Sequence, residues 1–335
     1  MTESFIESTF CKSDSSFEAP LRPQAITDFV GQDTVCQQLE VIIEAAKQRK
    51  EPLSHCLFCG PPGLGKTTLS HIIAKSMGTA ITVTSGPVID KAGDLAGLLT
   101  KLSEGDILFI DEIHGLNRTI EEYLYPAMED FALDLVIDSG TNARSVKVKL
   151  NKFTLIGATT RLGLISAPLR SRFGACLRLD YYKPEALESI IRRTSQILQV
   201  SIDSESVQEI ARRSRGTPRI ANNLLRWVRD YAQIKAGGVI SKPVAQAALK
   251  MIAIDEKGLD PVDSKILQVL IDHNNGDPVG LQTLALAIGE EPHTIEEVHE
   301  PFLVMQGLIK RTPRGREATQ LAFQHLGRQP INKED

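Results

Sequence analysis

The sequence predicts an α/β domain built on a parallel sheet, then a helical domain, and then a small domain of helices with a two-stranded wing. Three observations carry this prediction. A glycine-rich loop separates a short apolar run from a helical pattern early in the chain. Two later apolar runs end in polar residues, as buried central strands of a parallel sheet do. Beyond Lys183-Pro184 the periodicity is helical as far as Ile252, with no convincing strand.

Composition places the chain among ordinary globular proteins. Its 335 residues predict two or three domains, and 42% hydrophobic with 24% charged residues is typical of a soluble protein. No apolar run reaches the length of a membrane span. The net charge of −4 does not indicate nucleic-acid binding, but residues 310–316 form a basic loop, so any contact with nucleic acid is expected to be local. Residues 1–19 lack the basic start and apolar core of a signal peptide, and we predict a disordered lead-in.

The five cysteines are few and scattered. Cys56 and Cys59 have the spacing of metal ligands, but no second pair or histidine cluster accompanies them. Their place in the strand before the glycine loop favours buried structural thiols. A reducing cytoplasm is therefore the predicted compartment.

The glycine loop, residues 60–67, reads Gly-Pro-Pro-Gly-Leu-Gly-Lys-Thr and matches the phosphate-loop pattern at every required position. Residues 55–59 before it are predicted to be a buried strand, and residues 67–77 after it a helix. Backbone N–H groups of such a loop turn inward, and the helix N-terminus adds positive potential. Lys66 is then expected to reach the β- and γ-phosphates, and the Thr67 hydroxyl to hold Mg²⁺. The flanking elements disfavour the alternative, a glycine turn with a chance Lys-Thr.

A second chemical element follows the apolar run at residues 107–110. Asp111 and Glu112 stand at the predicted carboxyl end of that strand, where open α/β sheets bind ligands. Asp111 is expected to hold the Mg²⁺ shell, and Glu112 to orient and polarise the attacking water. A charged loop without chemistry is the alternative, and it is the weaker one downstream of a complete phosphate loop.

A further buried strand, residues 153–158, ends at Thr159 and Thr160, whose hydroxyls can bond a γ-phosphate or a water molecule. Arg170 and Arg172 follow at a helix end. Arginines there often belong to a solvated face. They matter here because an arginine supplied by a neighbour accelerates phosphoryl transfer about 10³–10⁵-fold.

Residues 133–150 predict a hairpin in which Val146, Val148 and Leu150 alternate with lysines. It is either an ordinary edge hairpin or an apolar strip for a partner.

Residues 216–219, Gly-Thr-Pro-Arg, predict a helix start with Thr217 as N-cap and Pro218 as the first helical residue. Arginine is unfavourable at a helix N-terminus, so Arg219 is expected to meet an anion, although a plain surface arginine remains the alternative.

Near the C-terminus, helices are predicted at residues 263–273, 281–288 and 294–306, followed by two short strands around a Pro-Arg-Gly turn. Three helices and a basic wing form a helix-turn-helix variant whose wing can contact phosphates. A small helical protein-interaction domain is the equal alternative from the pattern alone.

Six of these motifs occur in the order found in the RuvB family of AAA+ proteins, and the chain resembles that family from about Leu21 to Gly327. They are Gly60-Pro-Pro-Gly-Leu-Gly-Lys-Thr67, Asp111-Glu-Ile-His114, Gly157-Ala-Thr-Thr-Arg161, Leu169-Arg-Ser-Arg-Phe-Gly174, Gly216-Thr-Pro-Arg-Ile-Ala-Asn222 and Arg311-Thr-Pro-Arg-Gly-Arg316. The resemblance implies a lead-in at 1–19, a large ATPase domain at 20–182, a helical lid at 183–255 and a winged-helix head at 256–335.

The resemblance also implies a function. Family members are ATP-dependent DNA motors that use ATP and Mg²⁺ to drive branch migration of Holliday junctions in recombination and repair. They form homohexameric rings on duplex DNA and act with RuvA and RuvC. An ATP-driven protein remodeller would need an aromatic pore loop or a protease-docking motif, and neither is evident in the sequence. A DNA-binding regulator switched by ATP would need neither Glu112 nor Arg172.

The resemblance assigns roles residue by residue. Thr160, or Thr159 if the register differs by one, is implied as the first sensor, Arg172 as the finger acting in trans, and Arg219 as the second sensor. Arg311 and Arg316 are implied to contact DNA, and the hairpin with Val146 and Val148 to engage RuvA. The nucleotide site is implied to comprise Leu21, Arg22, Gly63, Gly65, Lys66, Thr67, Thr68, Glu129, Asp130, Phe131 and Tyr182.

Two positions depart from the family pattern. Gly115 stands where relatives usually have arginine, and it touches no predicted catalytic role. Pro292 stands where relatives often carry an arginine assigned to DNA, which leaves more of that contact to the wing.

Overall fold

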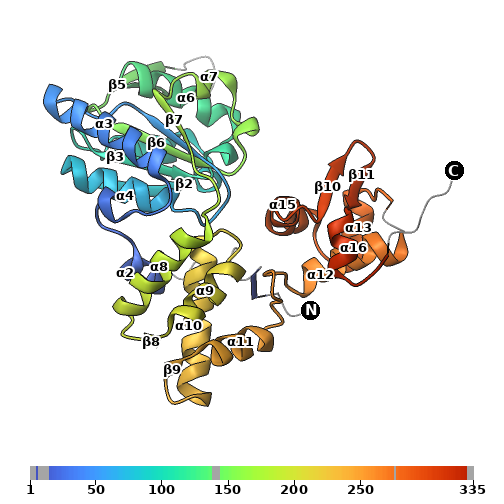
Figure 1. The fold of residues 1–335 in the computed structure, drawn as a ribbon. Helices are drawn as coiled ribbons and strands as arrows, with labels where there is room; N and C mark the ends of the chain where they lie inside the picture. The colour runs from blue at the N-terminus through green and yellow to red at the C-terminus, as the bar shows by residue number, and fades with distance from the viewer. Residues whose placement is uncertain (1–4, 7–14, 138–143, 275–276, 330–335) are drawn as a thin grey trace. The chain divides into compact units, whose positions relative to one another are not determined.

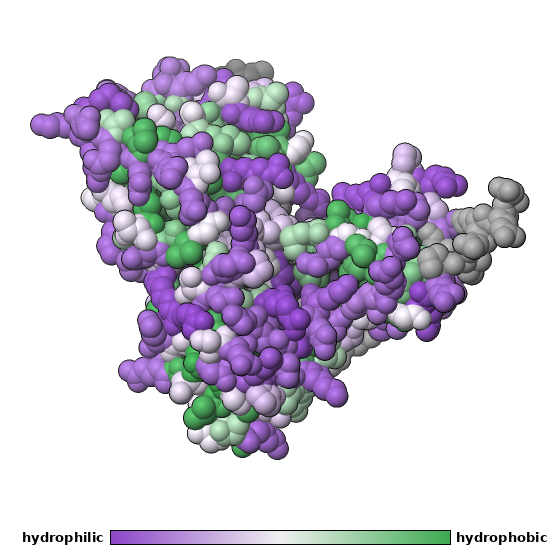
Figure 2. Space-filling view, viewed as in Figure 1, coloured by the Kyte–Doolittle hydropathy of each residue, from purple (hydrophilic) through white to green (hydrophobic). Residues whose placement is uncertain are grey.

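A computed structural model of the chain describes residues 5–6, 15–137, 144–274 and 277–329. The chain divides into two compact units: Ala19–Ala186, and Leu187–Asp335 together with Met1–Glu18. Figure 1 labels their helices and strands. None of the helices within the described residues is long and apolar enough to cross a membrane. Figure 2 shows a mainly hydrophilic face with small, separated hydrophobic patches.

The unit Ala19–Ala186 contains a five-stranded, all-parallel sheet in the order β2-β3-β6-β1-β7. Its strands are β1 Cys56–Cys59, β2 Ile81–Ser85, β3 Ile107–Asp111, β6 Thr154–Thr159 and β7 Ala175–Arg178. The three central strands are almost wholly buried, which explains why they read as unbroken apolar runs. The edge strand β7 was not predicted, because it is short and only Leu177 in it is buried.

Helices lie on both sides of this sheet (Figure 1). They are α3 Asp33–Arg49, α4 Lys66–Met77, α5 Ala92–Leu99, α6 Arg118–Glu129 and α7 Ala167–Arg170. Leu57, Leu108 and Leu155 project from β1, β3 and β6 into one buried cluster with the apolar residues of α5 and α6. Helix α4 packs against β3 and β6. The predicted parallel-sheet domain is confirmed.

The predicted hairpin is also confirmed. Strands β4 Ala132–Ile137 and β5 Arg144–Lys149 pair antiparallel, with Leu133 opposite Val148. The predicted turn at residues 139–142 lies outside the described residues. Val148 packs partly against the domain core, whereas the Val146 side chain is 42% exposed. Val146 is therefore the more available of the two valines.

The helical part of the second unit consists of α8 Pro184–Ile197, α9 Ser204–Arg213, α10 Pro218–Lys235 and α11 Lys242–Met251, with α8 beginning just before the unit boundary. The sequence predicted no strand in this part, and that prediction is wrong. Strands β8 Ser201–Ile202 and β9 Val239–Ile240 form a two-residue parallel pair. Two residues are too few to show a strand period. Thr217 does precede α10, but its hydroxyl donates to the Arg215 carbonyl rather than capping the helix.

The expected disorder of residues 1–19 does not hold for their last part. Helix α2 spans Ser15–Leu21, and its Phe17 ring lies under the Arg226 guanidinium at 4.5 Å. Ile6, also described, is fully buried. Aromatic and aliphatic side chains in this segment find partners that the local sequence could not indicate.

The C-terminal part has its own hydrophobic core, drawn from residues between Leu259 and Phe323. Its elements are α12 Pro261–Gln268 continued by the π-helix η5 Val269–His273, α13 Leu281–Ile288, α14 Pro292–Thr294 continued by the π-helix η6 Ile295–His299 and by α15 Glu300–Met305, β10 Ile309–Thr312, β11 Gly315–Ala318, and α16 Gln320–His325. The three predicted helices and the two-stranded wing, β10 with β11, are present. The π-turn precedes Pro301, which has no N–H to continue an α-helical ladder.

Candidate nucleotide site and basic wing

Three parallel strands end side by side at one edge of the sheet. The Gly60 N–H, at the start of the phosphate loop, donates to the Thr159 carbonyl at 3.1 Å, so β1 and β6 end together. Ile110 pairs with Gly157, which places Asp111 beside the end of β6. The phosphate loop, the paired threonines and the acidic pair are therefore neighbours, as predicted for ligand binding at the carboxyl ends of the strands.

The loop backbone has the conformation that a phosphate cradle needs. Gly63 and Gly65 have φ values of +76° and +103°, in the left-handed region that favours glycine. A Cβ on Gly65 would lie 2.8 Å from the Phe29 ring. Beneath the loop, the buried Tyr182 hydroxyl donates to the Leu64 carbonyl at 3.0 Å, and burial raises the pKa of Tyr182. Tyr182 thus holds the loop backbone in place.

Lys66 is the first residue of α4 and is 7% exposed. Its Nζ donates to the carbonyls of Gly60 and Pro61, both at 2.8 Å, so the ammonium lies within the curve of the loop. Thr67 and Thr68 occupy the first helical turn, which contains no acidic residue. The unpaired N–H groups of a helix start and the Lys66 charge both favour an anion at this point.

Asp111 is half-buried at the end of β3, and its Oδ1 accepts a hydrogen bond from the Glu112 N–H at 3.0 Å. Glu112 is exposed and has a φ of +46°, a left-handed conformation that costs a non-glycine residue about 1–2 kcal/mol. The turn is tightly packed, because a Cβ on Gly86 would lie 2.4 Å from the Glu112 carbonyl oxygen. Surrounding structure therefore holds Glu112 in an unusual backbone geometry at the strand end.

The two threonines after β6 have different surroundings. Thr159 is fully buried, with its hydroxyl 3.0 Å from His114 Nδ1 and accepting a bond from the Arg161 N–H at 2.9 Å. Thr160 is half-buried and follows the last residue of the strand. Because the Thr159 hydroxyl is already engaged within the domain, Thr160 is the better placed of the two to meet a ligand.

Arg172 is built into a different cluster, after α7. Its guanidinium lies over the Tyr125 ring at 4.4 Å, and Nη1 donates to the Pro168 carbonyl at 2.7 Å. Nη2 pairs with the Glu129 carboxylate at 3.1 Å. The side chain is 21% exposed, so it is held firmly but remains open to solvent.

Residues 129–131 belong to the same region, at the opposite end of β1 from the phosphate loop. His55, which precedes β1, lies 3.0 Å through Nε2 from the Met128 carbonyl and accepts from the Leu155 N–H through Nδ1 at 2.8 Å. These two bonds define the neutral tautomer with the proton on Nε2, and burial lowers the pKa of His55. The four residues of β1 span roughly 13 Å. Within one chain, the Arg172 cluster and the phosphate loop are therefore separated by the length of that strand.

The remaining predicted nucleotide residues lie in two places. Leu21 is buried, and Arg22 lines a pocket together with His71 of α4. Burial and the Arg22 charge lower the pKa of His71. Arg219 lies in the first turn of α10, in the second unit, and pairs with Glu18 of α2 at 3.0 Å. The anion that Arg219 was expected to meet is thus Glu18 within the described chain.

The wing arginines meet on one carboxylate. Arg311 and Arg316 are cross-strand partners in β10 and β11, and both bond Glu300, which is fully buried. Arg316 donates from Nε and Nη2 to Oε2 at 3.2 and 2.9 Å, and Arg311 Nε donates to Oε1. The Arg311 side chain is 55% exposed and that of Arg316 only 16%. Arg311 is therefore the more available to a phosphate.

Sequence reasoning did not identify Phe29, Tyr125 or Glu300. Tyr125 stands four residues before Glu129, a helical spacing that could have linked the two. Phe29 contacts Gly65, which is 36 positions further along the chain, and Glu300 binds Arg311, which is 11 positions further along. No local sequence pattern indicates such pairs.

The structure accounts for both departures from the family pattern. A Cβ on Gly115 would lie 2.9 Å from the Pro87 ring, so glycine suits this close approach. Pro292 is the first residue of α14. A backbone N–H at that position would make no hydrogen bond within the helix, so proline costs nothing there.

A phosphate loop, an acidic pair at a strand end, a helical lid and a winged helix together define a P-loop NTPase of the AAA+ class. The family described as the Holliday junction DNA helicase RuvB P-loop domain matches residues 21–179. The RuvB AAA lid domain matches residues 182–255, and the RuvB C-terminal winged helix domain matches residues 256–327. The chain belongs to the RuvB family.

Individual relatives agree over nearly the whole chain. The Holliday junction branch migration complex subunit RuvB of Protochlamydia amoebophila is 65% identical over 326 residues, covering 97% of this chain and 98% of the relative. The protein of the same name from Chlamydia trachomatis is 54% identical over 320 residues, covering 96% of each chain. The solved structure of the Thermotoga maritima RuvB Holliday junction branch migration motor has a TM-score of 0.84 and 47% identity, covering 92% of this chain and 99% of that one.

Proposed function

We propose that this protein is an ATP-hydrolysing DNA motor that drives branch migration of Holliday junctions in recombination and repair. The observation that carries the proposal is the meeting of the phosphate loop, Asp111, Glu112 and Thr160 at the ends of three adjacent parallel strands. The names of its relatives direct that hydrolysis toward four-way junction DNA.

The residues at this edge fit ATP and Mg²⁺. Lys66 and the first-turn N–H groups of α4 would bind the β- and γ-phosphates, and the Thr67 hydroxyl with Asp111 would hold the cation. The chemistry supplied by Mg²⁺, when held there, would be to offset the negative charge of the phosphates. Glu112 would accept a proton from the attacking water, and Thr160 would orient that water or the γ-phosphate.

We infer that the site is shared between subunits of a homohexameric ring. Arg172 lies with Glu129, Asp130 and Phe131 at the far end of β1 from the phosphate loop of the same chain. An arginine finger so placed can serve only a neighbour's nucleotide. Arg219 would sense the γ-phosphate, exchanging the Glu18 carboxylate for it.

Two further surfaces, the wing and the hairpin, would contact the partners. Arg311, supported by Arg316, would contact phosphates of duplex DNA, giving salt-sensitive binding with little sequence preference. The exposed Val146 of the hairpin would engage RuvA, and RuvC would resolve the junction afterwards. The four described cysteines are free thiols, which fits a cytoplasmic protein. We keep 20–182, 183–255 and 256–335 as the proposed division into ATPase, lid and head.

The decisive experiment measures ATP hydrolysis with and without four-way junction DNA and RuvA, alongside strand-exchange product on a synthetic junction. Glu112→Gln is expected to bind ATP with unchanged affinity and to lose turnover at least 100-fold, a typical size for general-base loss. Hydrolysis at the wild-type rate would remove Glu112 from the mechanism. ATP hydrolysis without any junction movement would leave the motor assignment unsupported.

Sharing of the site has its own test. Arg172→Ala is expected to bind nucleotide but not hydrolyse it. Mixing it with Lys66→Ala subunits restores some activity, because intact loops then meet intact fingers at mixed interfaces. Arg170→Ala, a neighbouring exposed arginine, is the matched control and should hydrolyse ATP normally. Mixed rings without any recovery would contradict action in trans.

A further inference from the structure

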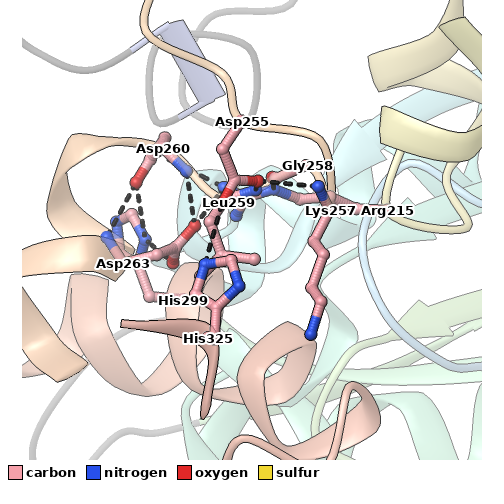
Figure 3. A network of polar contacts seen from close by, with 9 residues as sticks. All are labelled: Arg215, Asp255, Lys257, Gly258, Leu259, Asp260, Asp263, His299 and His325. Atoms are coloured by element: carbon pink, nitrogen blue, oxygen red, sulfur yellow. Dashed lines mark hydrogen bonds and ion pairs between the residues drawn. The ribbon is translucent and has the colours of Figure 1, made fainter. Parts of the chain in front are cut away.

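Arg215 connects the lid to the winged-helix head (Figure 3). It follows α9 of the lid and is 3% exposed. Its Nε donates to the Gly258 carbonyl at 2.9 Å, its Nη2 binds Asp263, and its guanidinium stacks on the Phe302 ring at 4.5 Å. Every one of these partners lies in the segment that follows the lid.

The backbone at this point is constrained as well. Arg215 has a φ of +53° and Gly216 a φ of +68°, two successive left-handed residues that turn the chain into α10. Left-handed backbone is unfavourable at arginine and persists only where contacts hold it. Arg219, the proposed second sensor, is one helical turn further on. The two arginines therefore stand at the two ends of one rigid turn.

The receiving carboxylates are the cap of the head's first helix. Asp260 Oδ1 accepts from the Asp263 N–H at 2.8 Å, and Asp263 Oδ2 accepts from the Asp260 N–H at 3.0 Å, which forms the capping box of α12. Asp263 Oδ1 lies 2.8 Å from His299 Nδ1. All three side chains are buried, and the Arg215 guanidinium supplies their counter-charge.

The charges agree with this arrangement. Burial acts to raise the pKa of Asp263, but Arg215 and the His299 bond outweigh it and hold that pKa below its usual value. Burial and the Asp263 charge raise the pKa of Asp260. Burial acts to lower the pKa of His299, and the Asp263 bond raises it above its usual value. Asp263 is thus the carboxylate that links the lid arginine to the histidine.

His299 leads directly to the DNA-facing wing. The next residue, Glu300, is the buried carboxylate shared by Arg311 and Arg316. The cluster that contains Arg215 and the cluster that contains the wing arginines therefore meet at consecutive residues of one helical segment, His299 and Glu300. Buried ion pairs contribute little net stability compared with apolar packing, and their best-attested use is to specify one relative arrangement of parts.

We propose that Arg215, Asp263 and His299 act as a positioning relay that makes the lid and the head move as one body. Glu300 extends the relay to the wing arginines. Movement of the lid on nucleotide turnover would then be delivered to the DNA grip instead of being lost at a flexible joint. The inference rests on the proposed function for its mechanical meaning, but the rigid joint itself is independent of that function.

The test measures the coupling of ATP hydrolysis to junction movement separately from ATP hydrolysis itself and from DNA binding. In Arg215→Gln we expect DNA-free ATP hydrolysis and nucleotide-free DNA affinity within twofold of wild type, since neither site contains Arg215. Strand-exchange product per ATP hydrolysed should fall at least tenfold. Arg212→Gln is the matched control and should leave the ratio unchanged. Arg212 is an exposed arginine near the end of the preceding helix α9, and among the described contacts it pairs only with Glu209.

A second pair of variants guards against misfolding. Arg215→Lys keeps the buried positive charge but cannot bond Gly258 and Asp263 together or stack as arginine does. It should fold and give an intermediate ratio. Asp263→Asn should reduce the ratio of product to ATP as Arg215→Gln does. The double variant should be no worse than either single variant, because both substitutions break the same contact between Arg215 and Asp263. Additive losses, or an unchanged product per ATP in folded Arg215→Lys, would overturn the relay.

A structural readout keeps the joint testable without motor activity. Spin labels at Met251→Cys in the lid and Leu286→Cys in the head, both exposed positions, would be placed in a Cys11→Ser, Cys176→Ser background. A narrow distance distribution is expected, broadening in Arg215→Gln but not in Arg212→Gln. A distribution equally broad in all three would refute the rigid joint. Failure of wild type to move junctions would instead refute the proposed function.

Discussion

Gly86→Ala tests whether the position of Glu112 is set by the packing of its turn. A Cβ on Gly86 would lie 2.4 Å from the Glu112 carbonyl oxygen and 3.2 Å from the Leu116 N–H nitrogen. Contacts of this type do not occur below 3.0 Å, so the Glu112 backbone must move by about 0.6 Å. A misplacement of about 1 Å can cost roughly 10²-fold in rate, and we therefore expect kcat to fall about 10- to 100-fold.

The assay is steady-state ATP hydrolysis, with binding of a fluorescent nucleotide measured in parallel. Nucleotide affinity should stay within about twofold, because the atoms nearest a Cβ on Gly86 belong to Glu112 and Leu116 and not to the phosphate loop. Overpacking should lower the free energy of unfolding by about 1–3 kcal/mol. Gly97→Ala is the matched control: nothing lies within 4 Å of its Cβ, and it sits inside α5. A folded Gly86→Ala protein with the wild-type kcat would refute the reasoning.

The other predictions concern stability, thiol reactivity and the wing. The pKa of His299 is raised in the folded protein, so its stabilising contribution is complete below pH 6.5 and is lost as the pH rises through the folded-state pKa. Thermal unfolding measured against pH should show this decline in stability, and His299→Gln should make the decline smaller. Thiol titration at pH 8 should label exposed Cys176 before the buried thiols, whose pKa values burial raises to about 11 or about 12; early labelling of the buried group would contradict this. That group is Cys36, Cys56 and Cys59. Gly315→Ala would place a Cβ 2.2 Å from the Val279 carbonyl and should weaken DNA binding about tenfold. Gly280→Ala should not, because its Cβ would meet only the Thr283 hydroxyl, at 4.0 Å.

Local chemistry was readable wherever residue type and spacing suffice. The phosphate loop, the acidic pair after β3 and the wing each lie within ten consecutive residues or fewer. Their strands and helices follow from runs of buried residues and from period. The β7 edge strand and the two-residue β8–β9 pair were not readable, because they are too short and too exposed to carry a period.

The site required more than local pattern. Choosing Thr160 over Thr159 depended on seeing the Thr159 hydroxyl bonded near His114. Ranking Arg311 above Arg316 for DNA depended on their unequal exposure around Glu300. The contacts with His114 and Glu300 join residues that are 45, 11 and 16 positions apart, so no local pattern indicates them.

The sequence by itself determined that this protein has a phosphate loop, an acidic pair at a strand end and a basic wing, because these features consist of particular residues at particular short spacings. Tertiary structure alone decided which groups stand together. It placed Arg172 at the far end of β1 from the phosphate loop of its own chain, and it joined Arg215 of the lid to Asp263 of the head. Both arrangements depend on residues that are distant in sequence. Only the packing of complete helices and strands brings such residues within contact distance.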